Sequence, residues 1–266
     1  MDTSDNVIPA KAGIHQNQEK LDSRLRGNDK MKLAHYSQLA DLFDFPGPEF
    51  IARGQNLLNC LRDHYPDAAD EIKCFLDGIP SGLKDQQELY TRTFDVQSIT
   101  TLDIGYVLFG DDYKRAELLS NLTREHKQAG NECGSELADH LPNILRLIPK
   151  LLDSELVAEL VSEILVPALI LMIREFDLER IEKKNTNYQK HYKTLIEAAP
   201  GSARVIYSRG LCALQCVLKK DFQVAEMIDK LKSWSQNHPP ADFLGLIEKE
   251  MDIEDNANPV NSGFDV

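Results

Sequence analysis

The chain has few of the features that mark secreted, membrane or metal-binding proteins. It contains five cysteines, an odd number without a CxxC pair, and no signal-peptide pattern. We therefore expect reduced thiols and a cytoplasmic location. No apolar run reaches the roughly 18–20 residues that cross a bilayer. The most apolar segment, 155–173, carries three glutamates and a proline, so we predict a buried helix there and no stable membrane insertion.

Basic residues are also scarce. The 266 residues include 30 lysines and arginines against 43 acidic residues, which gives a net charge of −13. Such a surface repels phosphate backbones, so we expect no nucleic-acid partner. It attracts basic segments of other proteins and speeds their encounter.

The motifs of common enzyme classes are missing as well. The sequence holds no glycine-rich phosphate loop, HExxH or GxSxG motif. Cys212 and Cys216 lack a second pair at metal-ligand spacing, so we interpret them as small buried side chains. The Asp139–His140 pair has two interpretations. It would suit a helical metal-dependent phosphohydrolase, although no further ligands stand out, or Asp139 would simply cap the helix that follows it.

What is present is a helical pattern. From Met31 onward apolar residues recur with a period near 3.6, and no segment alternates with period two. The clearest apolar faces are Leu33/Tyr36/Leu39/Ala40/Phe43, Ile51/Leu57/Leu58/Leu61, Leu83/Tyr90/Phe94, Ala116/Leu119/Leu122 and Leu141/Ile144/Leu145/Ile148, with further helices expected at 155–174, 174–184 and 203–234. We expect Pro142 in the first turn of its helix, and Pro149 and Pro167 to end or kink theirs. The pattern predicts an all-α, single-domain helical bundle over residues 31–234.

The two ends of the chain differ from this pattern. Residues 1–30 have no amphipathic period, and the run VIPAKAGI…LDSRLRGND resembles the product of a dispersed bacterial DNA repeat read in frame. We expect this extension to be disordered and dispensable, with Met31 as the natural start. Residues 235–266 are polar and acidic, and we expect a largely flexible tail there.

The stretch GYVLFGDDYKRAELLSNL, residues 105–122, concentrates charge at the start of a helix. Gly110 can adopt a positive φ, and Asp111 or Asp112 can cap the new helix, whose Tyr113 and Ala116 we expect to point inward. Lys114 and Arg115 are unusual in a first turn, because cations there oppose the helix dipole. They would either pair with neighbouring acids or belong to a cluster that recognises a peptide.

Three motifs carry a resemblance to a known family. ELYTRTFD (88–95) is similar to the E-x-Y-x-x-x-F-D element of the NarJ family, the assembly chaperones of respiratory nitrate reductase. TTLDIGYVLFGDDYKRAELL (100–119) stands where these chaperones carry a GD-containing stretch, and SELADHLPNILRLI (135–148) resembles their DHLP element. The order and spacing agree over roughly residues 33–232. Val107, Phe109 and Ala116 depart from the family's pattern and look more like chaperones of related molybdenum enzymes, so the client stays open.

The resemblance implies an all-helical chaperone of the wider NarJ and TorD/DmsD group, without catalysis and without a cofactor or metal of its own. Its partner would be the N-terminal segment of the catalytic subunit of a molybdopterin oxidoreductase, held in the cytoplasm while cofactor is inserted. We expect a monomer or weak dimer with an apolar groove and acidic rims. A metal-dependent phosphohydrolase centred on Asp139–His140 and a permanent adaptor subunit of the oxidoreductase are the alternatives.

The resemblance also implies a set of client-binding residues. Three aromatic residues would shape the groove or its floor, with core packing as the alternative for Phe94, and five polar residues would form a cluster that fixes local geometry or contacts the client. The remaining glycine, leucine and proline would be structural, and Asp95 belongs to the first motif. The whole set is Tyr90, Phe94, Asp95, Tyr106, Gly110, Asp111, Lys114, Arg115, Asp139, His140, Leu141 and Pro142.

Overall fold

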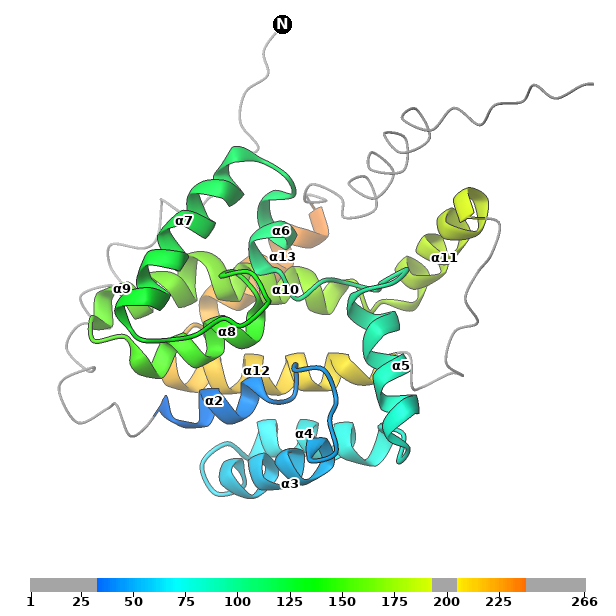
Figure 1. Ribbon diagram of the computed structural model, residues 1–266, viewed down its shortest axis with the longest axis horizontal. Coiled ribbons are helices and arrows are strands. Elements are labelled where there is room, and N and C mark those ends of the chain that lie inside the picture. Colours follow the sequence, from blue (N-terminus) through cyan, green and yellow to red (C-terminus); the bar gives the residue numbers. More distant parts are fainter. Residues whose placement is uncertain (1–32, 193–204, 238–266) are drawn as a thin grey trace, which may run out of the picture.

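The computed structural model describes residues 33–192 and 205–237, and these residues are almost entirely helical. Within them there is no β-strand, only an isolated antiparallel bridge between Asp103 and His140. The all-α prediction is therefore confirmed (Figure 1). The expectations for residues 1–30 and for the tail lie outside the described residues, except that the last helix continues to Asn237.

The helices follow one another with short connections. In chain order they are α2 (His35–Ala40), α3 (Phe50–Leu61), α4 (Pro66–Gly78), α5 (Leu83–Phe94), α6 (Ile104–Phe109), α7 (Tyr113–Gln128), α8 (Leu141–Leu147), the 3₁₀ turn η2 (Ile148–Lys150), α9 (Ser154–Glu159), the π-helical turn η3 (Leu160–Leu165), α10 (Val166–Arg174), α11 (Leu178–Tyr192), α12 (Ile206–Phe222) and α13 (Ala225–Asn237).

Helix α12 forms the centre of the bundle. It packs against α4 on one side and α10 on the other, while α2 contacts both α3 and α8. In Figure 1, α3 and α4 lie on one side of α12, and the helices α6 to α10 lie on the opposite side. The apolar period did not single out α4, although Pro66 stands in its first turn, where a missing N–H is tolerated.

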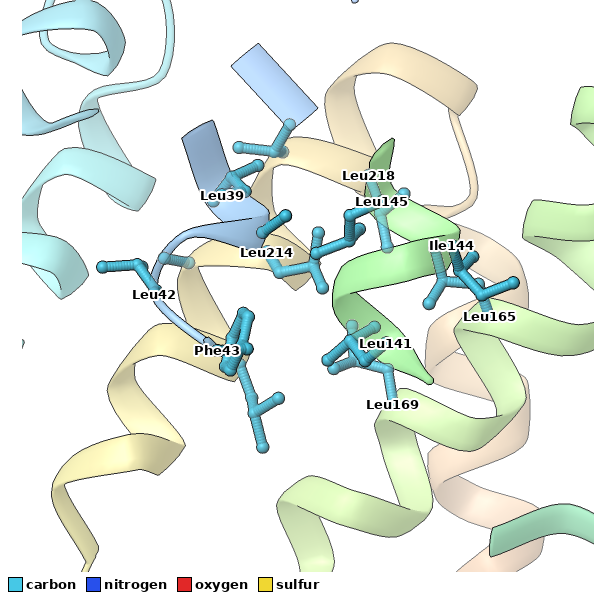
Figure 2. Packing of buried hydrophobic residues seen from close by; sticks show 14 of the residues in the cluster. Leu39, Leu42, Phe43, Leu141, Ile144, Leu145, Leu165, Leu169, Leu214 and Leu218 are labelled. Atoms are coloured by element: carbon cyan, nitrogen blue, oxygen red, sulfur yellow. The ribbon is translucent and has the colours of Figure 1, made fainter. Parts of the chain in front are cut away.

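The core is formed mainly by the apolar faces that the sequence predicts, although Leu83 and Ala116 of these faces are exposed. Figure 2 shows side chains of the α2 end, α8, η3, α10 and α12 meeting in one cluster, and its labelled members are Leu39, Leu42, Phe43, Leu141, Ile144, Leu145, Leu165, Leu169, Leu214 and Leu218. All of these are buried. Burying such a side chain fully stabilises the fold by about 1.5–3 kcal/mol relative to leaving it exposed. The cluster joins the N-terminal, middle and C-terminal helices into one unit.

The most apolar helical run spans Ser154–Arg174. By length and composition it could cross a membrane, but more than half of its most apolar part is buried inside the protein. A core helix passes the same test, and the predicted burial is confirmed for Val161, Leu165 and Met172. The π-helical turn η3 ends just before Pro167, where the wider turn accommodates a residue that has no N–H to donate.

Helix α11 holds the loop between α5 and α6 in place. The Lys184 ammonium donates to the carbonyl of Ile99, and the Tyr188 hydroxyl donates to the carbonyl of Ser98 at 3.3 Å. Lys184 is buried and forms an ion pair with the buried Glu175 carboxylate at 2.9 Å. This loop leads directly into the segment that carries the first charged residue of the candidate site.

Candidate functional site

Three chain segments meet where α6, α7 and α8 begin. The bridge between Asp103 and His140 brings two of them together. The Ile104 N–H donates to the carbonyl of Asp139 at 3.1 Å, and the Leu141 N–H donates to the carbonyl of Leu102 at 2.8 Å. These two backbone bonds place the start of α6 beside the start of α8.

Arg115, from the first turn of α7, joins the acids of both segments. Its Nε donates to Asp139 Oδ2 at 3.0 Å, and its second terminal nitrogen donates to Asp103 Oδ2 at 3.0 Å. Asp103 Oδ1 lies 2.9 Å from His140 Nδ1. We call Asp103, Arg115, Asp139 and His140 the Arg115 cluster.

Two residues of α6 give the cluster its shape. The Arg115 guanidinium carbon lies 5.1 Å from the centre of the Tyr106 ring, within the range of a cation–π contact. Gly105 is packed against the cluster, because a Cβ there would lie 2.6 Å from Asp139 Oδ2 and 3.3 Å from Arg115 Cγ. Any side chain at position 105 would therefore displace the carboxylate that Arg115 binds.

The two carboxylates of the cluster differ in their proton affinity. Burial raises the pKa of Asp139, whose side chain is 0% exposed, and the Asp103 charge raises it further, while Arg115 opposes both. Burial also acts to raise the pKa of Asp103, but the hydrogen bond and charge of His140, together with Arg115, outweigh it and lower that pKa. The pKa of Arg115 is raised, because its bonds and attraction to Asp139 and Asp103 outweigh the effect of burial.

The Asp139–His140 pair is occupied by partners within the chain. Asp139 accepts from Arg115, and His140 Nδ1 donates to Asp103, because an ionised carboxylate only accepts. The next carboxylate, that of Glu136, lies 4.0 Å from His140 Nδ1. Within residues 33–192 and 205–237 no group of three or more His, Cys, Asp or Glu side chains is arranged to hold a metal ion. The cluster thus has the geometry of a polar junction between helices.

A more exposed acidic surface adjoins the cluster. Burial raises the pKa of Tyr90, and the charges of Asp95, Glu136, Asp44 and Asp103 raise it further, so these acids lie close enough to act on one hydroxyl. The pKa of Asp95 is raised by partial burial and then by Glu136 and Asp103, while His140 opposes the shift. Several segments therefore contribute carboxylates whose charges act near Tyr90.

Exposed apolar residues follow three of these acids in the chain. Phe45 follows Asp44, Val96 follows Asp95 and Leu137 follows Glu136. The Phe45 side chain is 56% exposed, yet its ring makes an edge contact with the buried Tyr90 ring at 5.4 Å between centroids. We call Phe45, Asp95, Val96, Glu136 and Leu137 the Tyr90 face.

The structure brings together some of the polar residues predicted near Arg115, and leaves others at the edge or outside. Asp139, His140 and Tyr106 contact Arg115 or its partners. Asp111 is exposed and lies 3.9 Å from an Arg115 nitrogen, at the edge of the cluster. The side chain of Lys114 is exposed and forms no ion pair with any residue described, so it does not join the Arg115 cluster, and its contact with a client stays a prediction.

The predicted aromatic residues divide between core and surface. Tyr90 and Phe94 are buried, and both pack edge-on against Tyr207. The Tyr90 hydroxyl donates to the carbonyl of Phe43 at 3.1 Å. These two residues belong to the core, which was the alternative given for Phe94, while Tyr106 is partly exposed under Arg115. The apolar groove stays a prediction.

Two helix starts show where local rules hold and where they do not. Asp112 caps α7 by accepting from the Lys114 N–H at 2.9 Å, as expected. The prediction that Asp139 caps α8 is wrong, because His140 occupies the N-cap position without a side-chain bond and the Asp139 carboxylate accepts from Arg115 instead. The guanidinium of Arg115 offers the buried carboxylate a full positive charge as well as a hydrogen bond, whereas a backbone N–H offers no full charge.

Other local expectations divide in the same way. Gly110 has a φ of 60°, as predicted, and Leu141 and Pro142 are buried at the first turn of α8. Tyr113 and Ala116 were expected to point inward, and this is wrong: Tyr113 is 73% exposed and Ala116 is exposed. Because Arg115 takes the inward position of this turn, its neighbours face solvent.

Sequence reasoning missed two residues that build the site. Asp103 accepts from both Arg115 and His140, and Gly105 leaves room for the Asp139 carboxylate. Both stand in the motif 100–119, where an acid and a glycine interrupt an apolar run. A glycine within a helical pattern is a known sign of close approach by another group.

Comparisons with known proteins add no family assignment. A scan of the chain against models of protein families gave no match, and neither did a search of curated proteins.

Proposed function

We propose that this protein is an assembly chaperone of the NarJ type, which binds the N-terminal segment of the catalytic subunit of a molybdopterin oxidoreductase and assists cofactor insertion. It would act in the cytoplasm, without catalysis and without a cofactor of its own. The proposal rests on the three-motif resemblance together with the all-α fold.

The observation that supports it most is the convergence of the three motifs. Asp95 comes from the first motif, Arg115 from the second, and Asp139 and His140 from the third. Arg115 bonds Asp139 directly, and the charges of Asp95 and His140 act on one another. In the proposal, this gathering of charge at one place reflects the client site that the three motifs share in the family.

The Tyr90 face has the chemistry of a surface for a basic, amphipathic peptide. Asp95 and Glu136 are exposed acids, whereas Asp44 is already paired with Arg146 at 3.0 Å. Val96 and Leu137 are exposed apolar residues next to these acids in the chain, and Phe45 is an exposed aromatic residue in contact with Tyr90. A leader with basic residues and one apolar side would find both charge complementarity and apolar contact area there.

The direct test is calorimetry of the full chain with synthetic N-terminal peptides of the molybdopterin oxidoreductase catalytic subunits encoded in the same genome. We expect one peptide to bind with a Kd of about 1 μM or lower, close to −8 kcal/mol. Scrambled peptides of the same composition should not bind. If no peptide in the set binds, the proposal is wrong.

Surface variants then locate the contact. Phe45→Ala is expected to weaken binding by more than about 1 kcal/mol, as truncation of an anchoring aromatic does. Glu136→Lys should slow association and change its salt dependence. The matched controls are Leu152→Ala and Asp70→Lys, which change an exposed leucine and an exposed acid elsewhere on the surface. Equal losses in variants and controls would place the contact on another face.

Purification of the mature oxidoreductase separates a chaperone from a permanent adaptor subunit. A chaperone should associate with the immature catalytic subunit and be absent from the finished enzyme. Its stoichiometric presence in the active complex would favour the adaptor. Phosphatase activity of the purified chain that disappears in His140→Ala would favour the phosphohydrolase.

A further inference from the structure

A buried polar network lies behind the Arg115 cluster. His126, near the end of α7, has its Nε2 atom 2.9 Å from the carbonyl oxygen of Ala138, the residue before Asp139. Its Nδ1 atom lies 2.9 Å from the amide nitrogen of Asn131. His126, Asn131 and Asn143 are all buried, and none of them belongs to the Arg115 cluster.

The partners of Asn131 fix the orientation of its amide. The Lys150 ammonium donates to Asn131 Oδ1 at 2.7 Å, and Asn131 Nδ2 donates to the carbonyl of Asn143 at 3.1 Å. If the amide were flipped, its NH₂ group would face an ammonium and its oxygen would face a carbonyl. The oxygen therefore points to Lys150, and the NH₂ group is the one that faces His126.

The orientation of Asn131 fixes the protonation of His126 in turn. A carbonyl only accepts, so His126 Nε2 must carry the hydrogen that it shares with Ala138. Nδ1 must then be the unprotonated acceptor of the Asn131 NH₂ group. A proton on Nδ1 would set two donors against each other in a buried place, so the network is complete only with a neutral imidazole.

The rest of the network holds the loop that carries Asp139. Asn143 Nδ2 donates to the carbonyls of Leu137 at 2.9 Å and Cys133 at 3.3 Å. Together with His126, it fixes the backbone from residue 133 to residue 138. The Asp139 carbonyl and the Leu141 N–H then complete the bridge to α6.

The surroundings of His126 also favour the neutral form. Burial lowers the pKa of His126 and so does the positive charge of Lys150 from η2, while the bond to Ala138 opposes the shift. Lys150 is the charged group that faces the network from η2, and α8 contributes the uncharged Asn143. The titratable groups of the 131–138 segment are Cys133 and two exposed acids, Glu132 and Glu136. No carboxylate contributes to the shift of His126, so nothing there compensates an imidazolium.

We infer that neutral His126 is a positioning residue for the Asp139–His140 pair, and that its protonation releases the 133–140 loop from α6 and weakens the client site. The second half rests on the proposed function, because it assigns the client to this site. The first half concerns the loop alone and can be tested without any client.

The direction of the pH effect follows from the bonds. As the pH falls, the open loop binds a proton at the ordinary histidine value of about 6.5, before the closed loop does. The closed form is therefore fully favoured above that value and loses stability as the pH falls toward the lower pKa of buried His126. A proton that binds only to the open form shifts the opening equilibrium by up to about tenfold per pH unit.

The experiment is hydrogen exchange of the full chain between pH 7.5 and 5.5, corrected for intrinsic exchange rates. The reporters are the amides of Ile104 and Leu141, whose bonds join the two loops. We expect both to lose protection as the pH falls in the wild type. In His126→Gln the loss should vanish, because the glutamine amide can donate to Ala138 and accept from Asn131 without titrating. In the matched control His140→Gln, which keeps His126, the loss should persist.

A second variant should also abolish the opening at low pH, by giving a protonated His126 an acceptor. In Asn131→Asp the new carboxylate would accept from a protonated Nδ1 of His126 while keeping Lys150 as a partner, so low pH should no longer open the loop. If both variants fail to fold, nitrogen-resolved NMR of wild-type His126 gives the answer. A neutral imidazole with its hydrogen on Nε2 at pH 6.5 supports the inference, and an imidazolium or a hydrogen on Nδ1 overturns it.

The outcomes separate the inference from the proposed function. Loss of protection that is the same in wild type and His126→Gln would refute a role for His126. If exchange behaves as expected but no peptide binds to any variant at any pH, the proposed function fails and the positioning role stands. If a peptide binds, its affinity should fall between pH 7.5 and 5.5 in the wild type and hold in His126→Gln.

Discussion

Two carboxylate-centred junctions tie distant segments of this protein together, and they are built in opposite ways. At the first, Asp221 at the end of α12 accepts bonds from His35 and Tyr36 of α2, each at 3.0 Å, and from Tyr65 before α4 at 2.7 Å. We call these four residues the Asp221 junction. A single carboxylate there has three donors, so both of its oxygens are satisfied.

At the Arg115 cluster, by contrast, acceptors outnumber donors. Two carboxylates share one guanidinium, and Asp139 Oδ1 has no hydrogen-bond partner from another of the described residues although it is buried. Further acids, Asp95 and Glu136, lie close enough for their charges to act on one another. A junction that only holds helices together can be closed like that of Asp221, and a buried oxygen without a partner calls for an explanation. Under the proposed function, the excess of acid would meet a basic client segment.

The largest expected effect comes from removing the shared cation. Arg115→Met leaves the buried Asp139 without its partner, and breaking a buried ion pair costs about 3–5 kcal/mol of folding stability. Urea unfolding measures this. The control is Arg124→Met on the same helix, where the arginine is exposed and a change within about 0.5 kcal/mol is expected. Equal losses of stability in the two variants would show that Arg115 contributes no more to folding than a surface arginine.

The Asp221 junction should be less sensitive. Asp221→Ala leaves two hydroxyls and an imidazole without their acceptor, and His35 and Tyr36 are buried, but the two hydroxyls carry no charge that burial would penalise. We expect a loss of about 1–3 kcal/mol in the same urea measurement. Asp229→Ala, an exposed acid on α13, is the control and should stay within about 0.5 kcal/mol. A loss larger than that of Arg115→Met would reverse the comparison.

Close packing at the Arg115 cluster predicts a loss of stability that is similar to or smaller than that of Asp221→Ala. Gly105→Ala places a Cβ 2.6 Å from Asp139 Oδ2, so the carboxylate or the helix must move, at a cost of about 1–3 kcal/mol. Gly47→Ala is the control, because its Cβ would meet nothing within 4 Å. The melting temperatures of the two variants should differ clearly. Equal melting temperatures would show that position 105 can accommodate a Cβ.

The smallest expected effect is in the acid pH dependence. The pKa of Asp103 is lowered in the folded state, so its stabilisation is complete above the ordinary value of about 3.9 and is lost as the pH falls through the folded pKa. The stability difference between wild type and Asp103→Asn should therefore narrow below about pH 4. Asp111→Asn, which changes an exposed acid near Arg115, should differ little from wild type at any pH. A stability difference between wild type and Asp103→Asn that stays constant with pH would contradict the lowered pKa of Asp103.

Much of the fold follows from local rules, and the failures have specific causes. The face Leu141/Ile144/Leu145/Ile148 is buried as the period predicts, because one apolar stripe on a helix can be stable only against other apolar groups. The Asp139 cap follows the same kind of rule and is wrong, since Arg115, 24 residues away in the chain, offers its carboxylate a better partner. A local pattern does not contain that competitor.

Tyr113 and Asp103 illustrate the same limit from two sides. Tyr113 was assigned inward by its place in an apolar period, yet it is exposed because Arg115 turns toward the buried acids. Asp103 was passed over, although it accepts from two residues of other segments. The exposure of Tyr113 and the bonds of Asp103 both depend on how the start of α7 meets the segments that precede α6 and α8.

The sequence alone determined that this protein is an acidic, all-helical bundle whose turns fall at glycine and proline, because helical period, backbone conformation and net charge are local or additive properties. The tertiary structure decided which acids are buried, which cation they share and which histidine must stay neutral. Those properties depend on distances between segments far apart in the chain, and the free energy of a charge or a hydrogen bond changes with its partners and its burial.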